Sequence, residues 1–152
     1  MAQYAKRAGR TLIGLGVLAA GMLLALTLSQ ASTRGRPSNL DLSLERVTDR
    51  GVFRVELKSA LDPIQSFKVH SWSLHVSDAA GTPVTGASIK VGGGMPEHGH
   101  GLPTAPRSAP GSTAGDYVIN GMKFSMTAWW VLKLEIKAAD GRTDDITFNI
   151  VL

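Results

Sequence analysis

Two histidines separated by a single glycine are the residues of this sequence best suited to chemistry. His98 and His100 lie in the segment MPEHGHG, residues 95–101, which opens with Met95. Side chains two residues apart project to the same side of an extended chain, and the glycines allow the backbone to turn both imidazoles toward one ion. Imidazole binds copper, zinc, iron and nickel, whereas thioether sulfur favours Cu(I). The segment therefore predicts a copper site built from imidazole and thioether ligands.

Plainer interpretations of the same residue types stay open. A flexible, glycine-rich loop that happens to hold polar residues also accounts for His98 and His100. His70 and His75 lie in a predicted strand, where we expect surface histidines or hydrogen-bonded core histidines. These two are therefore not included among the predicted ligands.

The composition limits the chemistry that the chain can perform. Its 152 residues are the size of one domain, and the absence of cysteine excludes disulfides, thiolate nucleophiles and Cys-ligated metal clusters. The formal net charge is +4, but three of the basic residues, Lys6, Arg7 and Arg10, lie in an N-terminal stretch without acids. Without that stretch the chain is nearly neutral, which argues against nucleic acid as a partner.

The N-terminal segment predicts export. Behind the cationic residues 1–10, residues 12–28 form an uncharged, mainly apolar run, and Ser29 and Ala31 are small residues at the two positions that signal peptidase reads. The run is longer than most cleaved signals and just long enough to span a bilayer. We expect residues 1–31 to be a signal peptide, cleaved after Ala31, or else a helical membrane anchor. Either one places the rest of the chain in the periplasm or on the extracytoplasmic face of the cytoplasmic membrane.

Alternating apolar and polar residues follow a short polar linker, residues 32–38. A period of two is typical of strands with one buried face. We predict a hairpin over residues 40–58 with its turn at Asp49-Arg50-Gly51, and a bulge near His70-Ser71, where the apolar face changes sides. Further strands are expected at residues 67–76, 87–91, 117–119, 122–126, 130–136 and 146–152, with an Asn120-Gly121 hairpin turn.

One stretch is expected to have no regular structure. Residues 92–115 contain many of the glycines and prolines of the chain and few large apolar side chains. The remaining pattern of short strands and frequent turns predicts an all-β fold. We expect residues 39–152 to form an immunoglobulin-like antiparallel β-sandwich of seven or eight strands.

The order of motifs in the second half of the chain resembles a known family. These motifs are Met95-Pro-Glu-His98-Gly-His100-Gly, a Pro-rich loop, Gly115-Asp-Tyr117, Phe124-Ser-Met126, Trp129 or Trp130, and Leu132-Lys-Leu134-Glu-Ile136. They resemble the YtkA-like domain, which is related to FixH-like proteins, and the resemblance covers about residues 40–150. Members of the family are small exported or membrane-anchored β-sandwiches, some of them associated with copper handling near respiratory oxidase assembly.

The resemblance implies which residues bind the metal and what the partner is. By this likeness Met95, His98, His100 and Met126 match the His and Met pattern of the family. Where the family often has a glycine between the Met and the Trp, this chain has Thr127-Ala128. The implied partner is a membrane protein such as a respiratory oxidase or one of its assembly factors.

The sequence supports two hypotheses of function. The leading one is a non-catalytic, extracytoplasmic copper-binding protein that acts as a carrier or accessory factor near membrane respiratory complexes. The alternative is a metal-free interaction module that docks onto a membrane protein. An enzyme is the weakest choice, because the chain has no H-E-x-x-H, no G-x-S-x-G and no phosphate-binding glycine loop.

Overall fold

The protein is described by a computed structural model over residues 35–152. The predicted signal peptide or anchor, residues 1–31, and the start of the linker lie outside the described residues. The described part contains no helix long and apolar enough to cross a membrane. It consists of β-strands, turns and irregular connections.

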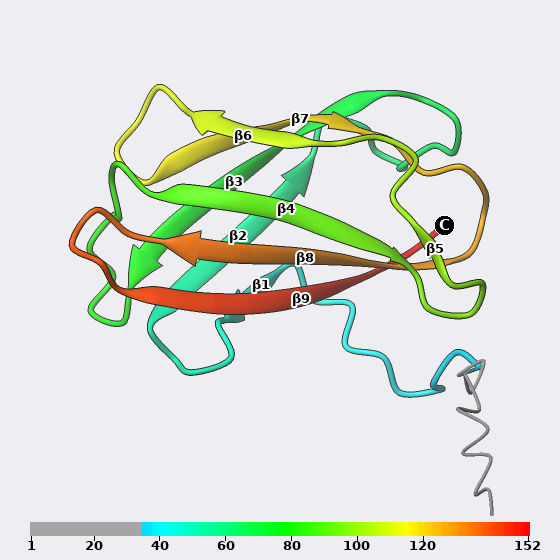
Figure 1. Cartoon of the computed structure of the whole chain (residues 1–152), viewed down its shortest axis with the longest axis horizontal. Coiled ribbons are helices and arrows are strands. Elements are labelled where there is room, and N and C mark those ends of the chain that lie inside the picture. Colours follow the sequence, from blue (N-terminus) through cyan, green and yellow to red (C-terminus); the bar gives the residue numbers. More distant parts are fainter. Residues whose placement is uncertain (1–34) are drawn as a thin grey trace, which may run out of the picture. The chain divides into compact units, whose positions relative to one another are not determined.

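Two antiparallel sheets form the domain (Figure 1). One sheet has the order β1-β2-β3-β7-β6, and the other has the order β5-β4-β8-β9. The strands are β1 (Glu45–Val47), β2 (Phe53–Ser59), β3 (His70–Asp78), β4 (Ser88–Met95), β5 (His100–Gly101), β6 (Arg107–Pro110), β7 (Asp116–Met122), β8 (Trp129–Lys137) and β9 (Thr143–Val151). The predicted antiparallel β-sandwich is therefore confirmed, with nine strands in residues 35–152 in place of seven or eight.

The core lies between the inward faces of the two sheets. Every second residue of β2 is buried while its neighbours are exposed, and β8 alternates in the same way from Leu132 to Lys137, after two buried tryptophans. Fully burying one large apolar side chain contributes about 1.5–3 kcal/mol. The largest buried side chains are Trp72, Trp130, Phe53, Phe124, Phe148, Leu74, Met95, Ile119 and Met122. Both sheets therefore supply the aromatic residues that hold them together.

The predicted first hairpin is partly correct. Its turn is confirmed, because the Gly51 N–H donates to the Thr48 carbonyl at 2.8 Å. The strand before it is shorter than predicted: β1 covers three residues, and Leu42 is 49% exposed. β1 is an edge strand that pairs only with β2. Leu44 still accepts a hydrogen bond from the Leu57 N–H at 2.8 Å, so the alternation of residues 40–44 continues the pairing with β2 only at its last residue.

The predicted bulge lies on the neighbouring strand. His70 pairs with Met122 and Trp72 with Ile119, so the extra residue belongs to β7. Gly121 has a positive φ of 81°, which suits glycine at a bulge. The Asn120-Gly121 pair was predicted as a hairpin turn, and this prediction is wrong: it bends β7 without ending it. The predicted strand over 122–126 therefore reduces to its first residue.

The prediction that residues 92–115 lack regular structure is also wrong. β4 continues through Gly92, Gly93 and Gly94 and pairs along this stretch with β8, and β5 and β6 follow. A Cβ atom added to Gly93 would overlap the carbonyl oxygen of Val131, and one added to Gly94 would overlap that of His100. These two glycines are present because β4 lies unusually close to the backbone on both sides, and they extend the strand.

The connections between strands gather at two ends of the sandwich (Figure 1). One end carries connections 60–69, 96–99 and 123–128 and the last residue of the chain, and we call it the His98 end. The opposite end carries turns 48–52, 79–87, 111–115 and 138–142, and we call it the Asp144 end. The fold thus brings loops that are distant in sequence together at each end.

Asp144 is the buried acid of the Asp144 end. Its carboxylate accepts hydrogen bonds from the Thr48 hydroxyl at 2.7 Å and from the backbone N–H groups of Arg50, Val52 and Asp145. Burial raises the pKa of this carboxyl, but the hydrogen bonds from Thr48, Asp145 and Val52 outweigh that effect, so the pKa lies well below its ordinary value. The charged carboxylate ties β9 to the β1–β2 turn.

Candidate metal-binding site

A tight hairpin between β4 and β5 carries the predicted histidines. Met95 and His100 are paired across the hairpin, and the N–H groups of His98 and Gly99 donate to the Met95 carbonyl at 3.1 and 2.9 Å. Gly99 has a φ of 66°, which lets the chain reverse direction within four residues. The hairpin is fixed to the sandwich through the pairing of β4 with β8.

The structure brings the two imidazoles together at the surface. The ring centroids of His98 and His100 are 6.2 Å apart, and the ring planes differ by 27°. Both residues are exposed. Metal–nitrogen bonds to imidazole are about 2.0–2.1 Å long, so rings at this separation lie within the span that one ion can bridge.

Met95 lies under the pair and not beside it. It is only 1% exposed and belongs to the hydrophobic core. It nevertheless contributes to the wall of an open groove of about 500 Å³, which His100 also lines. The groove is otherwise bordered by Gly93, Gly94, Pro96, Gly99, Gly101, Val131 and Lys133. Met95 therefore lies at the base of the hairpin that holds the imidazoles, with its side chain in the core.

Met126 occupies a separate connection at the same end. It is 40% exposed, and its carbonyl accepts a hydrogen bond from the Trp130 indole at 3.1 Å. Met122, four residues earlier, is fully buried. Within residues 35–152, no three His, Cys, Asp or Glu side chains gather around one point. The histidine pair therefore offers two imidazoles, and Met126 is the exposed thioether on a separate connection of the same end.

Glu97 has a partner that the sequence did not indicate. Its carboxylate accepts a hydrogen bond from the backbone N–H of Arg36 at 3.0 Å. Arg36 belongs to the linker, 61 residues earlier in the chain. The turn that carries the histidines is thus tied to the segment that enters the domain.

His70 is a hydrogen-bonded core histidine, which is one of the two roles that the sequence predicts for it. It is 8% exposed, and it packs against Trp72 and Phe124 with ring centroids about 6 Å away. Its Nε2 accepts a hydrogen bond from the Trp72 indole at 2.9 Å, and its Nδ1 lies 3.1 Å from the Lys68 carbonyl. Both ring nitrogens are occupied, so His70 is not available as a ligand.

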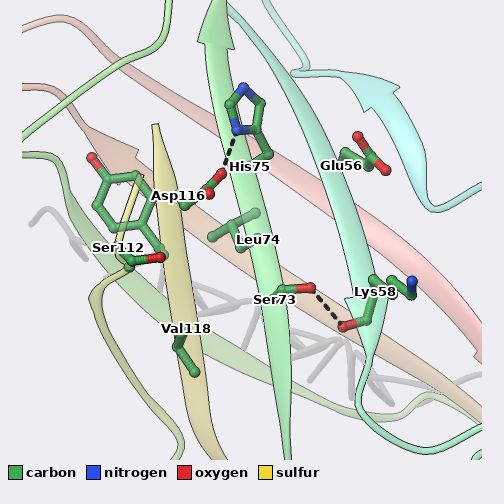
Figure 2. Close-up of a pocket in the computed structure, with 10 residues that line it drawn as sticks. Glu56, Lys58, Ser73, Leu74, His75, Ser112, Asp116 and Val118 are labelled. Carbon is green, nitrogen blue, oxygen red and sulfur yellow. Dashed lines mark hydrogen bonds and ion pairs between the residues drawn. The ribbon is translucent and has the colours of Figure 1, made fainter. Parts of the chain in front are cut away.

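His75 points to the opposite face of β3 and forms a pair with Asp116 (Figure 2). The Nδ1 of His75 and the Asp116 carboxylate are 2.6 Å apart, in an open pocket of about 410 Å³. Figure 2 shows the other ring nitrogen pointing away from Ser73 and Ser112, so the histidine activates neither hydroxyl. Sequence reasoning missed this pair because its members are 41 residues apart and meet only through the pairing of β3 with β7.

The fold and hairpin can now be compared with known proteins. A family model described as YtkA-like matches residues 49–135, which is more than half of the chain. The protein belongs to the YtkA-like family. The matched part of this YtkA-like protein includes Met95, His98, His100 and Met126, so the family prediction made from these motifs is confirmed. Comparison with the curated proteins found no significant match.

A solved structure supports the same fold. The domain is similar to the crystal structure of a DUF4426 family protein from Pseudomonas aeruginosa PAO1, with a TM-score of 0.53 and 16% sequence identity. The similarity covers 72% of this chain and 94% of that chain. At this level of identity the likeness establishes the β-sandwich and carries no information about ligands.

Proposed function

We propose that this YtkA-like protein is an extracytoplasmic copper-binding domain that carries the ion, or acts as an accessory factor, near membrane respiratory complexes. The observation that carries the proposal is the adjacent, exposed pair of imidazoles on the β4–β5 hairpin. His98 and His100 are its principal ligands. The thioethers of Met126 and Met95 are the soft ligands that complete the site.

Ligand type favours copper over zinc. Structural zinc sites use four protein ligands and catalytic ones three, drawn from Cys, His, Asp and Glu. The candidate site has two imidazoles with methionines at the same end of the sandwich. Thioether sulfur selects Cu(I), and a chain without cysteine has no thiolate to offer. This set is therefore best suited to Cu(I).

The exposure of the hairpin favours carriage over permanent storage. Binding residues on a short turn, supported by a rigid sheet, can meet a partner without opening the domain. Both histidines are on the surface, whereas the aromatic core below them is fully packed. A membrane protein such as a respiratory oxidase or its assembly factor is the proposed recipient.

Titration with Cu(I) in the presence of a competing chelator tests the site. We expect His98→Ala/His100→Ala to abolish competition with the chelator. His75→Ala is the matched control, since it removes an imidazole that lies with Asp116 in a separate pocket, and it is expected to bind copper as the natural protein does. Undiminished binding by the double variant would eliminate the site.

The proposed location has its own test. The intact mass of the protein from exporting cells distinguishes a chain that starts at Ser32 from one that starts at Met1 or Ala2. The first is expected for a cleaved signal peptide and a released carrier. The second is expected for a tethered domain, and a chain retained in the cytoplasm contradicts the proposal.

A metal-free interaction module is the second candidate function. The exposed side chains of Phe67, Val69 and Met126 at the His98 end favour it. This candidate predicts that a membrane protein is captured equally well with and without chelator. Loss of capture on chelation would contradict it and support the copper proposal.

A further inference from the structure

Three large apolar side chains are exposed at the His98 end. Phe67 is 69% exposed, Val69 63% and Met126 40%. They belong to two connections that lie side by side, because the Phe67 N–H donates to the Phe124 carbonyl at 2.7 Å and the hydroxyls of Ser66 and Thr127 are 3.4 Å apart. We call these three residues, together with Lys68 and Lys123, the Phe67 patch.

The backbone holds Phe67 outward at an energetic cost. Its φ of 66° is in the left-handed region, and it is the one residue other than glycine in residues 35–152 with a positive φ. A bulky residue is rare in this conformation. The hydrogen bond to the Phe124 carbonyl keeps it there. Backbone strain that presents an aromatic ring to solvent is typical of a contact surface.

The patch is basic at its edges. Neither Lys68 nor Lys123 forms an ion pair with any residue in the described part of the chain. The segments 63–72 and 117–134, which contain the patch, have no Asp or Glu. Two acids do lie at this end: Asp62, on the connection that carries Phe67, and Glu97, whose carboxylate accepts a hydrogen bond from the Arg36 N–H.

The opposite end of the sandwich is acidic. It carries Asp49, Asp78, Asp116, Asp140, Asp144 and Asp145, against the basic side chains of Arg50, Arg54, Lys137 and Arg142. The domain therefore has a charge polarity along the strands. An anionic surface attracts the end with the patch and repels the other end.

We propose that the Phe67 patch docks the domain onto an anionic lipid surface. Phe67 and Val69 enter the headgroup region, and Lys68 and Lys123 lie against lipid phosphates. The combination of exposed apolar residues with flanking lysines is that of peripheral membrane anchors. The apolar residues come from loops that end the sandwich, which suits a broad, deformable surface better than the complementary groove of a protein partner.

Docking of this kind is weak for a free domain, but it becomes effective when the chain is tethered to the membrane. Two apolar side chains and two lysines give modest affinity, but a tether raises the local concentration of the bilayer. The proposal needs no metal ion, so it can fail while copper binding holds. If both hold, docking keeps His98 and His100 near the membrane.

The absence of cysteine allows a single label to test the patch. The full-length chain is incorporated into vesicles after Gln65→Cys, which places an environment-sensitive fluorophore on an exposed residue beside Phe67. Ala79→Cys, at the Asp144 end, is the control position. Vesicles contain phosphatidylcholine alone or with added phosphatidylglycerol, and only protein that floats with the vesicles is measured.

We expect a blue-shifted emission at residue 65 with phosphatidylglycerol vesicles and none at residue 79. Lys68→Glu/Lys123→Glu should lower the shielded fraction at least about tenfold, and Lys68→Gln/Lys123→Gln should lower it less. Lys68 is exposed and Lys123 half-buried, so thermal unfolding of each variant is used to check that the domain is intact.

Three outcomes overturn the proposal. Identical emission in both kinds of vesicle means that the patch does not contact anionic lipid. Shielding that appears only in native membranes means that a protein covers the patch. Shielding that increases with protein density, whatever the lipid charge, means that a second copy covers it.

Discussion

The two ends of this β-sandwich use polar residues in opposite ways. At the Asp144 end, carboxylates are hydrogen-bonded to turns: Asp144 accepts from Thr48, Asp78 accepts from the N–H groups of Ala80 and Thr82, and Asp140 pairs with Arg142. At the His98 end, imidazoles and apolar side chains face solvent on short connections.

This difference separates stability from binding. The hydrogen-bonded acids fix the turns of one end, and the pKa values of Asp78 and Asp140 are lowered by backbone N–H groups of Thr82 and Arg142 respectively. The strained Phe67 and the exposed histidines do little for stability. Natural proteins often keep such costs at functional sites and offset them elsewhere. The comparison predicts that substitutions at the Asp144 end leave binding unchanged, and that substitutions at the His98 end leave the hydrogen-bonded turns of the Asp144 end unchanged.

The largest effect is expected for Asp144→Ala. The substitution leaves the backbone N–H groups of Arg50 and Val52 without their acceptor, which costs about 2–3 kcal/mol of unfolding free energy. Urea denaturation measures this loss. Cu(I) affinity is expected to stay unchanged, and a fall in affinity in a still folded variant would show that the two ends are coupled.

The pH dependence of unfolding gives a second test of the role of Asp144. The pKa of Asp144 is lower in the folded protein than its ordinary value of 3.8, so the folded state favours the carboxylate. Its contribution is fully present at neutral pH and declines as the pH falls below about 4. Unfolding measured against pH should therefore show a steeper acid loss for the natural protein than for Asp144→Asn. Parallel curves would contradict the assigned role.

A methyl group added at Gly94 should disrupt the His98 end, with little effect on the Asp144 end. In Gly94→Ala the new Cβ overlaps the His100 carbonyl, so β5 must move away from β4. We expect a loss of about 1–2 kcal/mol and at least a tenfold weaker Cu(I) affinity. Gly92→Ala is the control, because a Cβ there meets nothing within 4 Å. Equal behaviour of the two variants would contradict the close approach.

The smallest effect is a gain of stability at the strained residue. Phe67→Asn removes a bulky side chain from the left-handed region, which asparagine tolerates. The variant should be more stable by about 1 kcal/mol and should lose shielding by anionic vesicles. Val69→Asn is expected to lose shielding without gaining stability. A Phe67→Asn variant of unchanged stability would show that the position carries no strain.

Alternation made much of the fold predictable. In β2, β9 and most of β8, buried residues alternate with more exposed ones because one face of the sheet meets solvent. These strands can therefore be recognised from the sequence. The two sheets and the family motifs therefore followed from local sequence.

The errors came from contacts made by distant backbone. The triglycine of β4 has the composition of a loop, and only the nearness of Val131 and His100 shows why it is a strand. Gly121 forms a bulge because β3 pairs beside it. The His75–Asp116 pair and the Asp144 network likewise join residues more than 40 positions apart. Residue types suggest such pairs, but only the strand register brings them together.

The central claim concerns the identity of the copper ligands. X-ray absorption of the Cu(I)-loaded full-length chain reports the atoms bound to the ion. The account predicts imidazole nitrogen from His98 and His100 together with thioether sulfur, with the imidazole signal lost in His98→Ala/His100→Ala and the sulfur signal reduced in Met126→Leu. A copper spectrum without imidazole scattering, or one that the double substitution leaves unchanged, would contradict it.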